Sequence, residues 1–111
     1  MTKFDSAKYQ YDHIAIIIDK PRDGGIYFPE FKIWTSDYQQ SEFRIEWICF
    51  DKDCKFHPLI QSVSHVCFVV KNIQEAVKGR KILMEPFLLK DLWIAFIEDN
   101  GAVIEFFQPI K

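Results

Sequence analysis

The feature that most constrains the fold is a repeat of two short apolar segments along the chain. HIAIII, at residues 13–18, is similar to HVCFVV at residues 65–70, and FRIEWI, at residues 43–48, is similar to AVIEFF at residues 102–107. Short runs rich in β-branched and aromatic residues are typical of buried or half-buried strands. We therefore expect two related units, each with a first strand that opens with His and a last strand that carries a Glu.

The two units are expected to span about residues 11–50 and 62–108 of a single domain that covers residues 1–111. The His and the Glu are 33 positions apart in the first unit and 40 positions apart in the second. The difference corresponds to about two turns of helix. We expect the first unit to lack a helix that the second contains, because two prolines and two glycines in residues 19–31 oppose one.

The second unit is expected to fold in the order β-α-β-β-β. Asn72 is suited to cap a short helix together with Glu75, and Gly79 suits the end of that helix. A strand over residues 81–86 is expected to end at Pro86. Asn100 and the glycine after it predict the tight turn of a hairpin between the last two strands.

The first unit contains fewer regular elements in this interpretation. Residues 19–31 are expected to form a loop, and residues 32–36 and 42–50 to form a β-hairpin around a polar connection. Residues 51–64 are irregular and polar, and we expect them to link the two units without a helix or strand.

Length and composition indicate one globular domain. The chain has 111 residues, 49% of them hydrophobic, with a net charge of −2 and scattered Lys and Arg, so a basic nucleic-acid-binding face is not expected. No apolar run approaches the length of a membrane span, and the first residues do not resemble a signal peptide. We expect a cytoplasmic protein without nucleic-acid or membrane partners.

The three cysteines do not predict a disulfide framework, because their number is odd and their spacing irregular. Cys49, Cys54 and His57 form a C-x4-C-x2-H pattern that could suggest zinc, but the spacing is unusual and no second pair follows. The alternative is that Cys49, Cys54 and Cys67 are free, buried or half-buried thiols in a reducing compartment.

Two His and two Glu occupy matching places in the two units. They are His13 and Glu46 in the first unit and His65 and Glu105 in the second. Alternation along a strand places a small residue, Ala or Cys, beside each His on its own face, which leaves room for a bound group. Imidazole and carboxylate ligands suit a divalent metal such as Zn, Ni, Co, Mn or Fe. Such a metal can hold a substrate through two adjacent oxygens and stabilise developing negative charge.

Each candidate residue also has a purely structural interpretation. A His at the start of a strand is commonly a structural residue, and Glu46 could form an ion pair with Arg44 on the same strand face. Glu105 could lie at a partly exposed strand end near Gln108. His57, before a proline in a polar segment, is expected to be exposed. The three tryptophans are expected in the core or an interface, with an aromatic wall for a ligand as the alternative.

The pattern of paired units, with His opening the first strand and Glu in the last, resembles the vicinal oxygen chelate superfamily. This group includes glyoxalase I, methylmalonyl-CoA epimerase, bleomycin-resistance proteins and extradiol dioxygenases. The resemblance is strongest over residues 62–108 and weaker over residues 11–50. It implies an α+β fold, with two βαβββ-type half-units in a cup-shaped mixed sheet and the first half lacking its helix.

The resemblance implies that His13, Glu46, His65 and Glu105 are metal ligands on the concave floor of the cup. Glu105, between apolar neighbours on its strand face, is then the expected general base of a lyase or isomerase that acts on a small carbonyl-containing substrate. Phe107 and Ile48, which share the faces of the two glutamates, are expected to contact the substrate.

The alternative is a metal-free module of the bleomycin-resistance type that binds or sequesters a small molecule without catalysis. A homodimer is expected under either hypothesis, because small members often complete their sheets or sites through a partner. No phosphate loop, CoA-type basic cluster or glutathione signature is present, so the sequence does not identify the substrate.

Overall fold

The centre of the fold is an antiparallel pair of strands formed by the two repeated apolar runs. In the computed structural model, which describes residues 8–110, these strands are β1 (Gln10–Ile17) and β5 (His65–Val69). Each of them also pairs in parallel with a later strand, β1 with β4 (Ile45–Phe50) and β5 with β8 (Ala102–Pro109). The four strands that contain the repeated sequences therefore lie side by side in the middle of one sheet.

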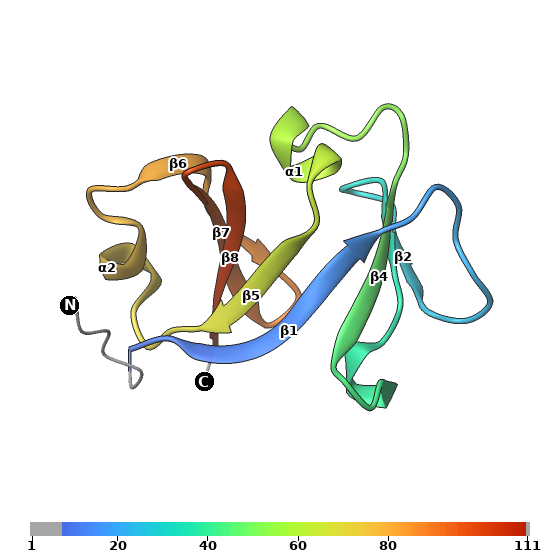
Figure 1. Cartoon of the computed structure of the whole chain (residues 1–111), viewed down its shortest axis with the longest axis horizontal. Coiled ribbons are helices and arrows are strands. Elements are labelled where there is room, and N and C mark those ends of the chain that lie inside the picture. Colours follow the sequence, from blue (N-terminus) through green and yellow to red (C-terminus); the bar gives the residue numbers. More distant parts are fainter. Residues whose placement is uncertain (1–7, 111) are drawn as a thin grey trace.

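The outer strands complete a mixed sheet of eight strands in the order β2-β3-β4-β1-β5-β8-β7-β6. They are β2 (Ile26–Phe28), β3 (Ile33–Thr35), β6 (Lys81–Leu89) and β7 (Leu92–Asp99). Two short helices, α1 (Pro58–Ser62) and α2 (Ile73–Val77), and a 3-10 turn, η1 (Tyr38–Gln40), complete the described elements. The fold class is therefore α+β. The sheet is strongly curled (Figure 1), which is compatible with the expected cup.

Several local predictions for the second unit are confirmed. Asn72 caps α2, its side chain accepting a hydrogen bond from the backbone N–H of Glu75 at 3.1 Å. Gly79 follows this helix with a φ of +73°. Asn100 and Gly101 have φ values of +50° and +91° between β7 and β8, as a tight hairpin turn of the I′ type requires.

The expectation that residues 19–31 form only a loop is wrong, because β2 lies within them. Gly24 and Gly25 adopt φ values of +80° and +74°, which turn the chain so that residues 26–28 can pair with β3. Residues 18–25 contain no helix or strand.

The expectation that Pro86 ends a strand is also wrong, since β6 continues to Leu89. A proline lacks the N–H needed in the middle of a sheet but is tolerated on an edge strand or at a bulge. Pro86 meets both conditions, because β6 is the last strand of the sheet and its register with β7 shifts between Met84 and Phe87.

The connection between the units contains the helix α1, which was not predicted. Pro58 occupies the first turn, where a missing N–H costs little, and Nδ1 of His57 accepts a hydrogen bond from the N–H of Leu59. Because a His caps this helix, the sequence lacks the Ser, Thr, Asp or Asn that usually marks the start of a helix. His57 itself is exposed, as predicted.

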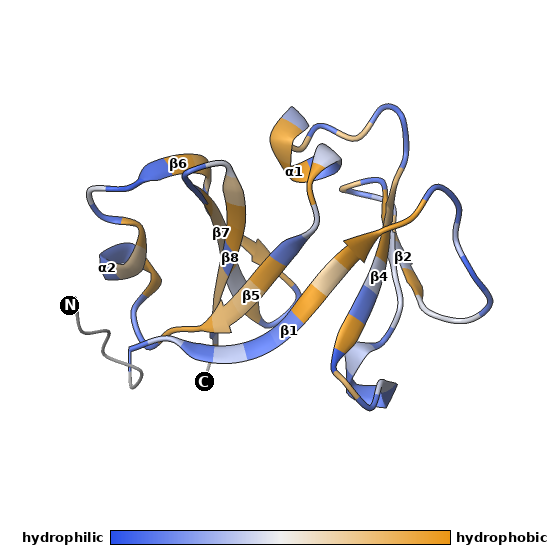
Figure 2. Ribbon diagram, in the orientation of Figure 1, coloured by the Kyte–Doolittle hydropathy of each residue, from blue (hydrophilic) through white to orange (hydrophobic). Residues whose placement is uncertain are grey.

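Two apolar clusters pack on opposite faces of the sheet. On the outer face, α2 packs through Ile73, Ala76 and Val77 against side chains of β7 and β8. On the inner face, Phe56 and Ile60 from the segment around α1 pack with inward-facing residues of the central strands. Figure 2 shows hydrophilic residues at the starts of β1 and β5 and a hydrophilic band within β4, next to otherwise hydrophobic parts of these strands. No helix in the described part of the chain is long and apolar enough to cross a membrane.

Candidate metal centre

Strand register brings the repeated His and Glu residues into two neighbouring rows on the inner face of the sheet. The first row runs across β1, β5 and β8 and contains His13, Cys67 and Glu105. The second row runs across β4, β1 and β5 and contains Glu46, Ala15 and His65. Ala15 and Cys67 have small side chains. They therefore form the floor of the site between the four larger polar side chains.

These polar groups are withdrawn from solvent. His13 and His65 are each 3% exposed and Glu105 is 8% exposed, and these are the buried polar or charged residues of the described chain. The side chain of Glu46 is 14% exposed. Buried carboxylates and imidazoles are costly unless they are paired, protonated or bound to a metal, so each of them needs a partner.

Each His is paired with the Glu of its own unit. Nε2 of His65 lies 2.8 Å from Oε1 of Glu105, and Nε2 of His13 lies 3.6 Å from Oε1 of Glu46. Nδ1 of His65, by contrast, is buried and finds no hydrogen-bond partner among residues 8–110.

A second network fixes the other side of the His13 ring. Nδ1 of His13 lies 2.8 Å from a carboxylate oxygen of Asp12, whose other oxygen accepts a hydrogen bond from Arg44 at 3.1 Å. The ring of Tyr38 stacks on His13 with 3.9 Å between centroids, and the Arg44 guanidinium lies 5.1 Å from the Tyr38 ring centre. The contact at Nδ1 and the stacked aromatic ring thus fix the orientation of the imidazole, and its Nε2 is directed toward Glu46.

The electrostatics of the cluster favour bound protons when no cation is present. Burial alone would lower the pKa of His13, but the neighbouring Glu46, Glu105 and Asp12 together raise this pKa to about 9. Burial raises the pKa of the Glu46 carboxyl, and the nearby Glu105 adds to this effect. Burial, followed by the charge of Glu105, raises the pKa of the Cys67 thiol. A group of buried acids that retains protons in this way can exchange them for a metal ion.

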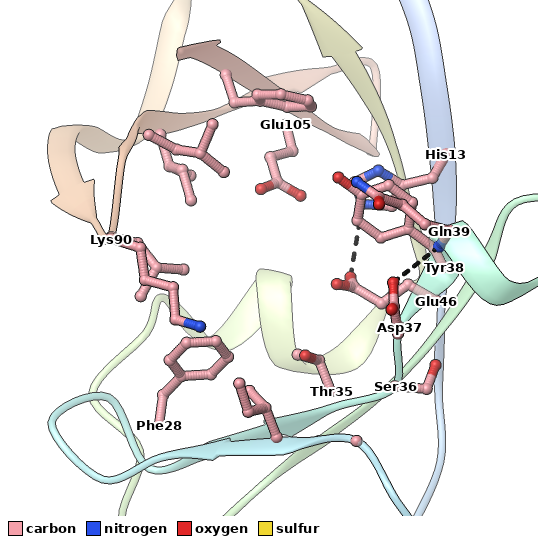
Figure 3. A pocket seen from close by; sticks show the side chains of 16 residues that line it. His13, Phe28, Thr35, Ser36, Asp37, Tyr38, Gln39, Glu46, Lys90 and Glu105 are labelled. Atoms are coloured by element: carbon pink, nitrogen blue, oxygen red, sulfur yellow. Dashed lines mark hydrogen bonds and ion pairs between the residues drawn. The ribbon is translucent and has the colours of Figure 1, made fainter. Parts of the chain in front are cut away.

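A cavity of about 560 Å³ opens over the cluster, and His13, Glu46 and Glu105 contribute to its wall. Figure 3 shows these residues around one end of the cavity, with Lys90 and Phe28 on the opposite side. A smaller cavity of about 60 Å³ reaches His65 together with the two glutamates. Each of the four candidate ligands therefore borders at least one of these two cavities.

The two expected substrate contacts take different positions. Phe107 lines the larger cavity and is a possible contact for a bound molecule. Ile48 is 5% exposed, belongs to the inner apolar cluster and borders only the smaller cavity.

Two structural alternatives for the candidate residues are not supported by the geometry. Arg44 lies just before β4, with a φ of +55°, and it pairs with Asp12 rather than with Glu46. Glu105 lies in the middle of β8 and is not a partly exposed strand end. All three cysteines are free and buried, and Cys49, Cys54 and His57 do not form a metal-ligand cluster in the described chain.

Three residues of the site were not predicted from sequence. Asp12 and Cys67 lie one and two positions, respectively, from predicted ligands in the sequence. The alternation of side chains along a strand does not reveal which residues they contact. Tyr38 lies in the polar connection before β4, and only the η1 turn brings its ring onto His13. A carboxylate next to a candidate metal-binding His was the available signal for Asp12.

The donor set fits a divalent metal ion. Two carboxylates would balance the double positive charge, and Asp12 supplies His13 with the second-nitrogen partner that metal-binding histidines usually have. His13, Cys67 and Glu105 have ligand atoms within 4.8 Å of one another and could hold such an ion, while Glu46 and His65 each lie beside one member of this group.

Comparison with known proteins identifies the fold but not a family. No family model matches the chain, and no curated protein is similar to it in sequence. A solved structure with a similar fold is that of the hypothetical protein BH1468 from Bacillus halodurans C-125, with a TM-score of 0.71 and 19% sequence identity. The match covers 93% of this chain and 96% of that chain. A likeness at this identity shows a shared fold.

Proposed function

We propose that this chain is a glyoxalase-like member of the vicinal oxygen chelate superfamily, with a divalent metal on His13, Glu46, His65 and Glu105. The reaction class is that of a lyase or isomerase acting on a small carbonyl-containing substrate. The observation that supports this most directly is the pair of His–Glu contacts, one from each unit, beside a cavity of about 560 Å³.

We also propose that the chain consists of two related half-units, of which the first has no helix. In each unit the first strand pairs in parallel with the last. In each, the Glu lies directly opposite the residue two positions after the His, with Glu46 opposite Ala15 and Glu105 opposite Cys67. The same cross-strand geometry thus occurs twice, which supports a duplicated unit more strongly than the sequence similarity does.

A metal ion held by these residues would supply Lewis acidity toward the substrate oxygens. Glu105 is the general base that removes a proton from the carbon beside the carbonyl, because it reaches the large cavity from a position with apolar neighbours. Phe107 and Ile94 line the same cavity as this carboxylate and give that part of the wall an apolar surface. Lys90, at the opposite wall, provides a positive charge for an anionic part of the substrate.

The test is elemental analysis by mass spectrometry of protein purified without chelators, combined with thermal shift on adding Zn, Ni, Co or Mn. We expect close to one metal ion per chain and a higher melting temperature with at least one of these metals. His65→Ala should lose both effects. Glu46→Gln provides a second variant in case His65→Ala fails to fold, because its side chain is closer to solvent. Absence of metal together with absence of any thermal shift would overturn the proposal.

Two observations favour the second candidate, a metal-free binding module. Both His residues already have carboxylate partners, and the Tyr38 ring beside His13 offers a planar wall for an aromatic ligand. In this case a ligand should quench the fluorescence of Trp34, which lies beside the cavity-lining Gly25, and chelators should have no effect on binding.

The expected homodimer and cytoplasmic location remain proposals. Both edges of the sheet, β2 and β6, lack a further strand in the described chain, and Tyr27 and Leu88 on them are 46% and 47% exposed. A partner that pairs with one of these edges would cover such residues. Size-exclusion chromatography with light scattering tests the dimer. The three free cysteines fit a reducing compartment.

A further inference from the structure

We propose that Cys67 is a thiolate ligand of the metal at this centre, which restricts the site to metals that bind sulfur. The inference rests on the proposed metal site and goes beyond it by adding a ligand and narrowing the class of metal.

The position of Cys67 between two candidate ligands supports this assignment. Its partner across β1 is His13, and its partner across β8 is Glu105, so it occupies the middle of the row. The ligand atoms of these three residues all lie within 4.8 Å of one another. Two donors bound to one ion at about 2.0–2.3 Å are at most about 4.6 Å apart, so small side-chain movements suffice.

Within the described chain, this is the one group of three His, Cys, Asp or Glu residues with ligand atoms so close together. His65 and Glu46 each approach a member of the group, with His65 at 2.8 Å from Glu105 and Glu46 at 3.6 Å from His13. The thiol therefore lies inside the proposed ligand set.

Burial and asymmetry between the two units also point to a role for the sulfur. Cys67 is 0% exposed, so its thiol is shielded from solvent. The matching position in the first unit is Ala15, which has no donor atom. The two units would thus contribute unequal ligand sets, with the sulfur coming from the second unit alone.

A thiolate ligand changes which metals the site accepts. Sulfur favours Zn²⁺, Co²⁺ and Fe²⁺, whereas Mn²⁺ and Mg²⁺ prefer sites built only from oxygen and nitrogen donors. On binding, the Cys67 thiol releases its proton to the solvent and its sulfur donates an electron pair to the metal, with no change of oxidation state. We therefore expect the protein to bind Zn²⁺ and Co²⁺ strongly and Mn²⁺ weakly.

The test uses Co²⁺ alone as the probe. Full-length metal-free protein is titrated with Co²⁺ under reducing conditions, and absorption is followed in the near ultraviolet, where sulfur-to-cobalt charge transfer appears, and in the visible. The wild-type protein should develop the charge-transfer band in step with binding. Cys67→Ala should lose this band while its visible cobalt bands remain, and its preference for Zn²⁺ over Mn²⁺ should decrease at least tenfold.

Cys49→Ala is the matched control, because Cys49 is also a free, buried thiol but lies outside the cluster. It should retain the charge-transfer band and the metal preference. Cys67→Ala is a mild change, since it places at this position the residue found at the matching position of the first unit.

The outcomes separate this inference from the proposed function. Co²⁺ binding with visible bands but no charge-transfer band in the wild type would overturn the thiolate ligand and leave a His and Glu site. A band that persists in Cys67→Ala would also overturn it. If Co²⁺, Zn²⁺ and Mn²⁺ all fail to bind, the proposed metal site itself is wrong, and the thiolate ligand with it.

Discussion

Nε2 of His65 lies 2.8 Å from Oε1 of Glu105, although the two residues are 40 positions apart in the chain. The contact exists because β5 and β8 pair in parallel, with Cys67 opposite Glu105 and His65 one row away. His65 also packs against the edge of Phe96, so the pair is enclosed by apolar groups. A buried pair of this kind loses much of its stabilisation when either partner is removed.

We expect the pair to be strongly coupled in the metal-free protein. His65→Ala or Glu105→Ala leaves a buried polar group without its partner, which costs about 3–5 kcal/mol in the free energy of unfolding. The double variant should cost at least about 1 kcal/mol less than the sum of the two single variants. Urea denaturation with a chelator present measures the free energy of unfolding of the wild type, the two single variants and the double variant.

The ion pair between Lys81 and Glu98 is the control, with a distance of 3.0 Å and a lysine side chain that is 70% exposed. Its coupling should be below about 1 kcal/mol, because solvent screens exposed charges. Equal coupling energies for the two pairs would contradict the buried contact.

The pKa of His13 predicts how stability depends on pH without metal. This pKa is raised from 6.5 to about 9, so the folded protein binds the proton more tightly than the unfolded chain does. The stabilisation is therefore fully present below about pH 6.5 and is lost as the pH rises through about 9. His13→Gln should remove this part of the pH dependence. Urea denaturation across this range measures the effect, and parallel curves for the two proteins would contradict it.

Asp12 is expected to act as a positioning residue for His13. Asp12→Asn weakens the contact with Nδ1 and the pairing with Arg44, and the loss of such a supporting carboxylate typically lowers metal affinity about 10- to 100-fold. Competition with a coloured chelator measures this affinity. Asp53→Asn is the control, because Asp53 is 64% exposed and pairs only with Lys32 in the described chain. Similar affinities for both variants would argue against a positioning role.

The two adjacent glycines before β2 should respond differently to the same substitution. Gly24 and Gly25 have similar φ values of +80° and +74°, so alanine costs about 1–2 kcal/mol of backbone strain at either position. At Gly25 a new Cβ would also lie 2.4 Å from the carbonyl oxygen of Thr35 and 2.6 Å from the Trp34 ring, whereas at Gly24 it meets nothing within 4 Å. Gly25→Ala should therefore destabilise the protein by about 1–3 kcal/mol more than Gly24→Ala does.

Thermal denaturation of the two glycine variants checks this difference. Because Gly25 lines the larger cavity, Gly25→Ala should also disturb the β2 and β3 wall of the site. Equal melting temperatures for the two variants would show that Gly25 does not lie close to Thr35 and Trp34.

Local elements with strong sequence signals were predicted well. Asn72 and the Asn100-Gly101 turn are defined by hydrogen bonds and φ angles within a few residues, so neighbouring sequence is sufficient to recognise them. The elements that were missed depend on distant partners. The strand β2 exists because β3 pairs with it, and β6 continues past Pro86 because it lies at the edge of the sheet.

By itself, the sequence determined that His13 and His65 each begin an apolar run and that Glu46 and Glu105 lie in later strands. It did not determine the strand ends, because β1 begins at Gln10, so that His13 does not open it, and Glu46 is the second residue of β4. Alternation of side chains along a strand also determined that Glu105 shares a face with Val103 and Phe107, because this depends only on backbone geometry. These properties are local, so the order of residues in the sequence is sufficient to recognise them.

Only the tertiary structure decided which residues meet across the strands. In the folded protein Arg44 pairs with Asp12 instead of Glu46, Tyr38 stacks on the His13 ring, and Cys67 lies between His13 and Glu105. Each of these contacts depends on strand register or on the path of a turn. Register is a property of the whole sheet, since it is chosen by the packing of both faces, and so no single segment of the sequence specifies it.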